Sequence, residues 1–305
     1  MTRVLLTGGS GFLGKIVYDV LSEKRCKVTR LGRSGHSEII ADLCQDIPVI
    51  QRPVDIVVHS AGKAHVVPKS TKEQRQFFRV NVTGTSNLLK GIGLMPVLPR
   101  SIILISSVSV YGLTEGVGIG EDHPLEANDA YGRSKLQAEN LALSWCEQNK
   151  VPLTILRLPL IAGPNPPGNL GTMIRGIKSG YYVNIGGGKA RKSMVMAADV
   201  ANILPEAAAH PGIYHLTDGH HPSLKELGQR IAAQLGTRPP RSMPLPIARA
   251  LGYGGDAIDI LFPGKAPISS KTIAKLTASL TFDDALARKT LGWDPHRVID
   301  AFTLH

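Results

Sequence analysis

The sequence predicts an α/β fold, in which a doubly wound parallel β-sheet carries a smaller α/β lobe built by the C-terminal part of the chain. Three observations predict it. Short apolar segments alternate with helical stretches up to residue 158, and such alternation produces right-handed βαβ units with parallel strands. Segment 101–106 is apolar enough to form a strand buried on both faces. Beyond Pro159 the pattern changes to a proline- and glycine-rich loop and to short, proline-interrupted helices.

The expected elements follow one another in a regular order. We expect strands at 4–7, 27–31, 55–59, 101–106 and 153–158. Helical spacing is found at 12–24, 72–90 and 129–149. Asp129 stands where its side chain can cap the last of these helices. Segment 213–217 is expected to return to the main sheet as a further strand.

The composition is that of a folded, basic protein. Hydrophobic residues make up 43% of the 305 residues and charged residues 19%, which excludes a disordered chain. The net charge is +11, and no acidic residue occurs between Glu147 and Asp199. Such a region indicates an anionic partner, which can be a nucleic acid, a membrane surface or a phosphorylated small molecule. Because aromatic residues make up only 5% and none is interleaved with a basic motif, no nucleic acid is expected.

The cysteines, the histidines and the apolar runs indicate the compartment and whether a metal is bound. The three cysteines, Cys26, Cys44 and Cys146, form neither a disulfide framework nor a CxxC pair. The apolar run at 4–6 is too short for a signal peptide, and the stretch 101–110 is too short to span a bilayer. The histidines show no metal-ligand spacing with carboxylates. We therefore expect a cytoplasmic protein that binds neither a metal nor a membrane.

A glycine-rich loop joins the first strand to the first helix. Its glycines recur at three-residue intervals, and its expected cofactor contacts are Gly8, Ser10, Gly11, Phe12, Leu13 and Gly14. In dinucleotide-binding folds such glycines make the tight turn, admit the pyrophosphate to the backbone, and let the helix pack on the strand. The helix N-terminus then offers free N–H groups to the phosphates. We expect a Rossmann domain at 1–158, completed by a return at about 193–217, and a mainly substrate-binding lobe at 159–305.

The end of the second strand indicates which dinucleotide is bound. NAD sites usually carry an acidic residue there for the ribose hydroxyls, but this chain has Arg30-Leu31-Gly32-Arg33. Arg33, assisted by Arg30, can pair with a 2′-phosphate, so we expect NADP, with NAD as the alternative. Asp42 and Leu43 lie further on, where a carboxylate can accept a hydrogen bond from the adenine amine.

Tyr131 and Lys135 form a YxxxK motif on the expected long helix. The spacing places both side chains on one face, where the ammonium is expected to lower the pKa of the phenol. A tyrosine tuned in this way can exchange a proton with a substrate alcohol or carbonyl. The serine-rich segment 106–109 follows the buried strand, and ligands bind at the carboxyl ends of such strands. The spacing and its context predict a catalytic site.

These motifs resemble those of the extended short-chain dehydrogenase/reductases that act on nucleotide sugars. The resemblance covers essentially the whole chain, with motifs in the family's order: TGGSGFLG at 7–14, NVTGT at 81–85, SSVSVYG at 106–112 and YGRSK at 131–135. It implies that Tyr131 is the acid/base, that Lys135 tunes it and holds the nicotinamide ribose, and that Ser107 hydrogen-bonds the reacting oxygen.

The same resemblance implies contacts beyond these three residues. The segment after the third expected strand should pass beside the cofactor through Ala61 and Gly62, and Asn81 should steady it. In and beside the acid-free segment, the substrate's diphosphate or sugar should be bound by Asn169, Arg191 and Lys192. Members of the family commonly dimerise through the helix after Asn81 and the helix that bears Tyr131, so a homodimer is expected.

Several reactions remain open within this resemblance. Leu160 and Ala162 stand where many epimerases carry Asn and Tyr, and the segment around them resembles reductases of bacterial O-antigen synthesis. Together with Arg33, this favours NADPH-dependent reduction of a UDP-4-keto-6-deoxy-N-acetylhexosamine at C4. The alternative is an NAD-dependent UDP-sugar 4-epimerase, which returns the hydride that it removes. A dehydratase is not favoured because its acidic pair is missing, and a non-catalytic nucleotide-binding regulator is not favoured because Tyr131 and Lys135 are present.

Overall fold

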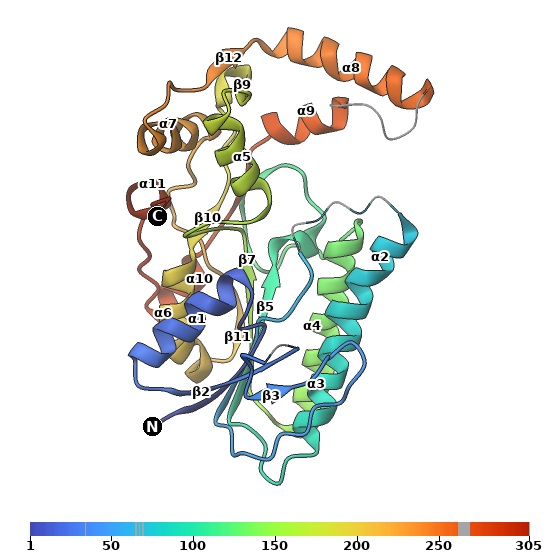
Figure 1. The fold of residues 1–305 in the computed structure, drawn as a ribbon, viewed down its shortest axis with the longest axis vertical. Coiled ribbons are helices and arrows are strands. Elements are labelled where there is room, and N and C mark those ends of the chain that lie inside the picture. The colour runs from blue at the N-terminus through green and yellow to red at the C-terminus, as the bar shows by residue number, and fades with distance from the viewer. Residues whose placement is uncertain (34, 65, 67, 69, 262–268, 305) are drawn as a thin grey trace.

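The main body of the protein is a sheet of seven parallel strands in the order β11-β7-β5-β4-β1-β2-β3 (Figure 1). The computed structural model describes residues 1–33, 35–64, 66, 68, 70–261 and 269–304. The strands of the sheet are β1 (Arg3–Thr7), β2 (Lys27–Gly32), β3 (Ile39–Ile40), β4 (Ile56–His59), β5 (Ser101–Ser107), β7 (Leu153–Leu158) and β11 (Gly212–His215). The chain winds outward from β1 in both directions, which confirms the doubly wound fold class.

Helices cover both faces of this sheet. On one face α1 (Phe12–Glu23) packs against α6 (Ala197–Ala209), and on the other α3 (Gly84–Gly93) packs against α4 (Ala130–Asn149) (Figure 1). The α4 helix begins after Asp129, whose carboxylate accepts a hydrogen bond from the Gly132 N–H at 2.7 Å. The expected cap is thereby confirmed.

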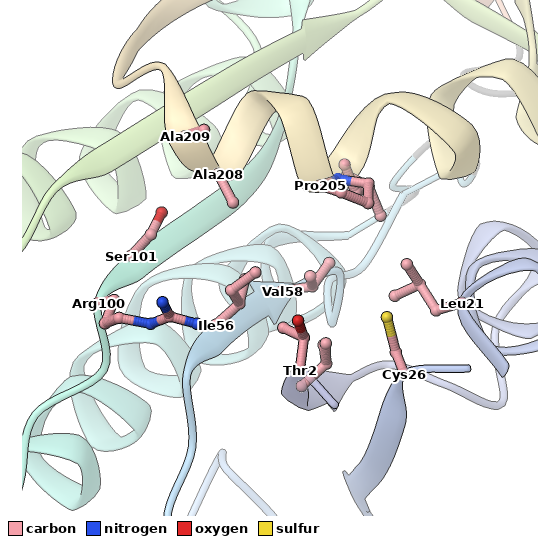
Figure 2. A pocket seen from close by; sticks show the side chains of 12 residues that line it. Thr2, Leu21, Cys26, Ile56, Val58, Arg100, Ser101, Pro205, Ala208 and Ala209 are labelled. Carbon is pink, nitrogen blue, oxygen red and sulfur yellow. The ribbon is translucent and has the colours of Figure 1, made fainter. Parts of the chain in front are cut away.

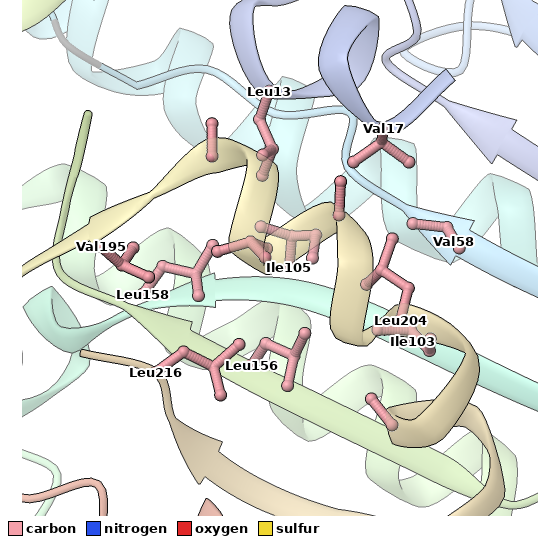
Figure 3. Close-up of a cluster of buried hydrophobic side chains, with 14 of the residues drawn as sticks. Leu13, Val17, Val58, Ile103, Ile105, Leu156, Leu158, Val195, Leu204 and Leu216 are labelled. Atoms are coloured by element: carbon pink, nitrogen blue, oxygen red, sulfur yellow. The ribbon is translucent and has the colours of Figure 1, made fainter. Parts of the chain in front are cut away.

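The core between the sheet and the α1–α6 layer is continuous and apolar. Figure 3 shows Leu13 and Val17 of α1, Leu204 of α6, and Ile103 and Ile105 of β5 gathered in one cluster. All the residues of β5 are buried, as expected for a strand covered on both faces. The carboxyl end of β5, where serines replace apolar residues, thus lies at the edge of this packed core.

The structure corrects the single helix expected at 72–90. The segment forms α2 (Thr71–Phe78), a π-helical turn (Arg79–Thr83) and α3, and the Gly84 N–H bonds to the Arg79 carbonyl across the turn. Apolar spacing does not distinguish such a turn from an α-helix, and π turns occur frequently at functional sites. The short strand β3 was also not expected, because two residues carry no periodic pattern.

The C-terminal lobe is built from short elements. Three two-stranded parallel sheets pair β6 (Gly116–Ile119) with β13 (Leu280–Phe282), β8 (Leu160–Ala162) with β10 (Met194–Met196), and β9 (Val183–Ile185) with β12 (Arg241–Met243). The helices after β8, α6 apart, are α5 (Gly168–Lys178), α7 (Leu224–Leu235), α8 (Leu245–Leu261), α9 (Ser270–Thr277), α10 (Ala285–Leu291) and α11 (Val298–Ala301). Among the described residues, a 3₁₀ turn at Gly186–Gly188 follows β9, and another at Val108–Tyr111 directly follows β5 of the main sheet.

The expected return to the main sheet is confirmed. β11 pairs in parallel with β7, with Ile213 opposite Ile155. In the part of the chain that the structure describes, no helix has both the length and the apolar character needed to cross a membrane.

Candidate active site

The glycine loop closes tightly at the carboxyl end of β1. Gly8 has a φ of +73°, and a Cβ there would lie 2.6 Å from the backbone nitrogen of Ala61. A Cβ on Gly14 would overlap the Gly8 carbonyl, which also accepts the Gly11 N–H at 2.9 Å. Only glycine fits at positions 8 and 14. The loop therefore brings the N-terminus of α1, which begins at Phe12, to a cradle of the kind that binds phosphate.

The end of β2 differs from the sequence expectation in one respect. Glu38 folds back, and its carboxylate accepts hydrogen bonds from the Arg30 backbone at 2.7 Å and from its guanidinium at 2.9 Å. The guanidinium also lies 4.2 Å from the ring centre of Tyr18, and the Arg30 side chain passes beside Gly9 of the glycine loop. An acidic group therefore lies against Arg30 of β2, although none occurs at the end of the strand in the sequence. Arg30 is engaged by this pair, whereas Arg33 is exposed.

Asp42 and Leu43 lie in the turn after β3. The Asp42 carboxylate accepts hydrogen bonds from the Cys44 N–H at 3.1 Å and from Gln45 Nε2 at 2.9 Å. The hydrogen bond from Gln45 is the main cause that lowers the pKa of Asp42, and the charge of Arg33 contributes. Asp42 is thus an ionised hydrogen-bond acceptor, close enough to Arg33 for their charges to interact. The two residues expected to contact the adenosine part of the cofactor therefore lie near each other.

Asn81 links the segment after β4 to the helix that carries Tyr131. Its Oδ1 accepts the Lys63 N–H at 2.7 Å, and its Nδ2 donates to the Lys63 carbonyl at 3.1 Å and to Ser134 Oγ at 2.8 Å. A Cβ on Gly62 would lie 3.2 Å from Asn81 Oδ1 and 3.8 Å from Lys135 Nζ. The fold thus brings Gly62, Asn81 and Lys135 together from three separate motifs.

A buried chain of polar side chains supports the same segment. Thr7 Oγ1 lies 2.7 Å from His59 Nδ1, and His59 Nε2 lies 2.9 Å from Thr85 Oγ1. Thr7 Oγ1 also accepts the Ala61 N–H at 3.1 Å. Burial lowers the pKa of His59 to about 3, and the charge of Lys135 adds to the shift. The ring is therefore neutral at neutral pH. We did not expect this chain from the sequence, although a histidine at the end of an apolar strand was a possible signal.

Ser107 and Tyr131 meet at the carboxyl end of β5. Ser107 ends the strand and caps the following 3₁₀ turn, where its Oγ accepts the Ser109 N–H at 3.2 Å. Burial raises the pKa of Tyr131, a side-chain hydrogen bond with Ser107 opposes this, and Asp129 adds to the rise. The net shift is upward. It is opposite to the downward shift of the pKa that we expected Lys135 to cause.

The position of the Lys135 ammonium explains the difference. Lys135 is 8% exposed, and its Nζ donates to the Ile105 carbonyl at 2.6 Å. Burial lowers the pKa of Lys135 to about 8, and the charge of Glu139 opposes this shift. The ammonium therefore stays mostly protonated at neutral pH, with one N–H bond used by β5 and two remaining donors.

Glu139 and Arg157 form a buried ion pair, which the sequence motifs did not reveal. Glu139 is 0% exposed and Arg157 2%, and Arg157 Nη2 donates to Glu139 Oε2 at 2.8 Å. Ser106 Oγ donates to the same carboxylate, and the Tyr111 hydroxyl accepts a hydrogen bond from Arg157 Nη1 at 2.8 Å. The available signal was the position of Glu139, one helical turn after Lys135 on α4. The pair fixes α4 to β7 directly beside the catalytic candidates.

The residues expected to bind the substrate lie in the C-terminal lobe. Asn169 is exposed in the first turn of α5. Arg191 Nη1 donates to the His221 carbonyl at 3.0 Å. Lys192 Nζ donates to the Lys275 carbonyl at 3.2 Å, and burial lowers the pKa of Lys192. Arg191 and Lys192 thus make these contacts within their own lobe, whereas Ser107, Tyr131 and Lys135 lie on β5 and α4 of the main lobe.

A cavity of about 380 Å³ lies at the opposite end of the sheet (Figure 2). Its lining includes Ser101 at the start of β5, Cys26, and Pro205 of α6. Ligands of doubly wound sheets bind at the carboxyl ends of the strands. The cavity is at the amino ends, so it is separate from the candidate active site.

Ser107 and Tyr131 stand at the same edge of the sheet as the glycine loop, and this combination is typical of dinucleotide-binding enzymes. The chain belongs to the NAD dependent epimerase/dehydratase family, whose model matches residues 4–216. It is therefore an NAD(P)-dependent enzyme of that family.

Named relatives match this chain over most of its length. The UDP-glucose 4-epimerase of Vibrio cholerae is 28% identical, over 97% of this chain and 92% of the relative. The N-acetyl-alpha-D-glucosaminyl-diphospho-ditrans,octacis-undecaprenol 4-epimerase of Escherichia coli O157:H7 is 26% identical, over 92% of this chain and 87% of the relative.

Solved structures share the fold. The UDP-glucose 4-epimerase of Thermotoga maritima, solved with UDP-glucose, has a TM-score of 0.74 at 18% identity, over 99% of this chain and 97% of that chain. The RMD protein of Pseudomonas aeruginosa, solved with NADPH, has a TM-score of 0.71 at 20% identity, over 98% and 95%. These similarities extend over both lobes and confirm the fold class.

Proposed function

We propose that the protein is a nucleotide-sugar 4-epimerase, which removes a hydride from C4 of a UDP-sugar and returns it to the opposite face. The observation that carries the proposal is the meeting of Ser107 and Tyr131 at the carboxyl end of β5, with the buried Lys135 one helical turn further along α4. It is supported by 4-epimerases among the relatives that match nearly the whole chain. These relatives favour epimerisation over the 4-ketoreduction that the sequence placed first.

The residues at the glycine loop fit a dinucleotide. Gly8 and Gly14 let the loop backbone close against Ala61 and against the Gly8 carbonyl, and the loop leads directly into the first turn of α1, whose backbone N–H groups suit a phosphate. When bound, NAD(P) supplies the hydride acceptor of the reaction. On this proposal, Gly62 and Asn81 hold the segment beside it, and two free donors of Lys135 bind its ribose hydroxyls.

The proton steps fall to Tyr131 and Ser107. The Tyr131 phenolate takes the proton from the C4 hydroxyl of the sugar, and the phenol that results later gives the proton back to the carbonyl oxygen. Ser107 holds that oxygen by a hydrogen bond and so orients it toward the phenol. Burial raises the pKa of Tyr131, so a nearby positive charge would favour the phenolate that this step needs. Lys135 is the buried cation placed one helical turn away on α4.

A second candidate function is NADPH-dependent reduction of a UDP-4-keto-6-deoxy-N-acetylhexosamine in O-antigen synthesis. Arg33 favours it, because this exposed guanidinium near Asp42 suits a 2′-phosphate. Leu160 and Ala162 favour it as well, since they replace the residues found in many epimerases. Glu38 favours NAD instead, because it brings a carboxylate against Arg30 on β2, the strand at whose end NAD sites usually carry an acid.

On either reaction, we assign the substrate's diphosphate or sugar to Asn169, Arg191 and Lys192. The proposal also includes a homodimer formed through α3 and α4, which light scattering tests. A monomer at micromolar concentration would remove this part of the proposal without affecting the chemistry.

Two assays separate the candidate reactions. In the first, the protein is incubated with UDP-glucose or UDP-N-acetylglucosamine and a trace of cofactor, and the 4-epimer is measured by NMR. In the second, it is incubated with NADPH and a UDP-4-keto-6-deoxy-N-acetylhexosamine, and the loss of NADPH absorbance is measured. Epimer without net cofactor consumption supports the proposal. Stoichiometric NADPH oxidation without epimer formation replaces it by the reductase, and neither reaction in a cofactor-binding protein points to a regulator.

The cofactor choice has its own test. Arg33→Ala should weaken NADP binding by about tenfold and leave NAD binding unchanged, because a charged hydrogen-bonded contact contributes about 1.5–3 kcal/mol. Arg25→Ala is the matched control at the other end of the second strand. Equal loss for both cofactors would reject the role of Arg33.

A further inference from the structure

The cavity at the amino ends of the strands lies where the core layer between the sheet and α6 ends (Figure 2). Ser101 of β5 is on the same face of the strand as Ile103, which belongs to that core. It stands opposite Ile56 of β4, and α6 contributes the small side chains of Ala208 and Ala209 to the same cavity. The space is therefore left open because short side chains stand on both sides, where longer ones fill the rest of the layer.

The cavity is large enough for a ligand, and its walls are mostly apolar. Three of its lining residues, Val4, Leu21 and Val58, are buried, whereas Pro205 and Ala209 are exposed. The cavity thus has a buried apolar floor and reaches the surface. An engineered apolar cavity of about 150 Å³ holds benzene, so a volume of about 380 Å³ has room for about fifteen non-hydrogen atoms.

Ser101 adds a buried polar atom to these apolar walls. The residue is 3% exposed, and its Oγ has no hydrogen-bond partner among the described residues. Buried hydroxyl groups nearly always have a partner, because an unmet one destabilises the fold. The Ser101 hydroxyl is therefore available to donate a hydrogen bond to a ligand in the cavity.

A positive charge stands directly beside this hydroxyl. Arg100 precedes Ser101 and also lines the cavity, and its side chain is 74% exposed. Its Nε lies 3.8 Å from Asp55 Oδ1, beyond hydrogen-bond distance. The Asp55 carboxylate already accepts hydrogen bonds from the Arg3 backbone at 2.8 Å and from its guanidinium at 2.7 Å and 3.0 Å. Two guanidinium groups thus face one carboxylate, and N–H donors of Arg100 remain for a further anion.

We propose that this cavity binds a small carboxylate with an apolar chain, of about the size of decanoate. The chain lies in the apolar space between β1, β4 and α6. The carboxylate accepts hydrogen bonds from the Arg100 guanidinium and from the Ser101 hydroxyl, and a guanidinium matches a carboxylate by two parallel N–H···O bonds. A neutral ligand would leave the guanidinium without an acceptor, and a cationic ligand would be repelled by Arg100.

The proposed site is independent of the proposed reaction. The glycine loop and Tyr131 lie at the carboxyl ends of the strands, whereas the cavity lies at their amino ends. Decanoate should therefore bind whether or not the protein turns over a nucleotide sugar, and each of the two proposals can fail without the other.

Isothermal titration calorimetry of the full chain tests the inference with three probes below their micellar concentrations: decanoate, decanol and decylamine. Decanoate should bind at one saturable site, decanol about tenfold more weakly, and decylamine not at all. Arg100→Gln should weaken decanoate binding about tenfold and leave decanol binding unchanged. Ser101→Ala should weaken decanoate binding about threefold, because one hydrogen bond is lost. Ala208→Leu should abolish binding by filling the cavity.

Two controls show whether the effects belong to the cavity. Arg52→Gln removes an exposed arginine that precedes β4 and does not line the cavity, so it should bind decanoate as the unmodified chain does. Decanoate should also protect Cys26, which lines the cavity, from alkylation by N-ethylmaleimide. Cys44, which is likewise half-buried but lies in the turn after β3, should react at an unchanged rate. Mass spectrometry of the digested protein measures both rates.

The inference is overturned if decanoate shows no saturable binding, or if it binds without protecting Cys26. It is also overturned if Arg100→Gln and Ser101→Ala both bind decanoate normally, or if decanol binds as tightly as decanoate. Circular dichroism should show unchanged folding in the Arg100, Ser101 and Arg52 variants. If Ala208→Leu fails to fold, the Ser101 variant and the protection of Cys26 still decide the location of the site.

Discussion

The two lobes hold their candidate site residues in different ways. In the main lobe, Asn81 and Lys135 are buried and bonded to backbone groups of neighbouring strands and loops. In the C-terminal lobe, the Arg191 side chain is 49% exposed and is held among short two-stranded sheets. An unmet buried polar group costs about 1–3 kcal/mol, whereas an exposed ion pair contributes about 0–1 kcal/mol. Changes in the main lobe should therefore affect catalysis or folding, and changes in the C-terminal lobe should affect substrate affinity alone.

The largest expected effect lies at Tyr131. Tyr131→Phe should lower turnover by at least about a hundredfold, because the hydroxyl that carries the proton is lost. Cofactor affinity, measured by fluorescence titration, should stay close to that of the unmodified enzyme. Tyr181→Phe is the control, since Tyr181 is 85% exposed in the C-terminal lobe. Normal turnover of the Tyr131 variant would reject the assignment, and lost cofactor binding would make its role structural.

The next effect concerns the buried ion pair. Glu139→Gln should lower the free energy of unfolding by about 3 kcal/mol, because Arg157 keeps a buried charge without its partner. Urea denaturation measures the change. Glu206→Gln is the matched control, since this side chain is 51% exposed, and its effect should stay within about 0.5 kcal/mol. Equal effects of the two variants would contradict the contrast between buried and exposed charges.

A smaller effect is expected at Lys192. Lys192→Ala should raise the KM for the nucleotide sugar about tenfold, with kcat little changed, because a phosphate contact made equally in ground and transition states contributes to binding alone. Lys225→Ala, on the exposed side of α7, is the control. Steady-state kinetics decide, and an unchanged KM for the Lys192 variant would remove it from the substrate site.

The last effect is spread over several pH units, and it is a pH dependence of stability due to His59. The pKa of His59 is about 3 in the folded protein, against an ordinary value of 6.5. Between these values the unfolded state binds the proton and the folded state does not, so stability falls as the pH falls from about 6.5 toward 3, by up to about 1.4 kcal/mol per pH unit. Below the folded pKa this loss is complete.

Urea denaturation between pH 6 and pH 4 compares the slopes. His59→Gln should give a shallower dependence than the unmodified chain, whereas His36→Gln, at an exposed position, should keep the slope. An unchanged slope in the His59 variant would show that the ring titrates normally in the folded state.

The sequence predicted those features of the fold that depend on residues close together in the chain. The strands at the sheet centre, the Asp129 cap and the glycine loop depend on neighbouring residues, and the structure confirms these elements. Glu38 beside Arg30, and Glu139 beside Arg157, depend on chain segments that tertiary packing brings together. The predicted downward shift of the Tyr131 pKa was wrong for the same reason. The upward shift follows from burial of the phenol, and the Ile105 carbonyl holds the Lys135 ammonium that was expected to oppose it.

The π turn before α3 has a consequence for which face of α3 meets the core. The turn closes between the Arg79 carbonyl and the Gly84 N–H, one residue more than an α-helical turn holds. The wider turn absorbs this extra residue, so that α3 follows α2 without the rotation of about 100° that one more residue adds to a regular α-helix. If the same residues formed continuous α-helix, Leu88 and Ile92, both buried, would be rotated away from the core. The π turn therefore keeps the apolar face of α3 on the core, while Asn81 within the turn holds the Lys63 backbone.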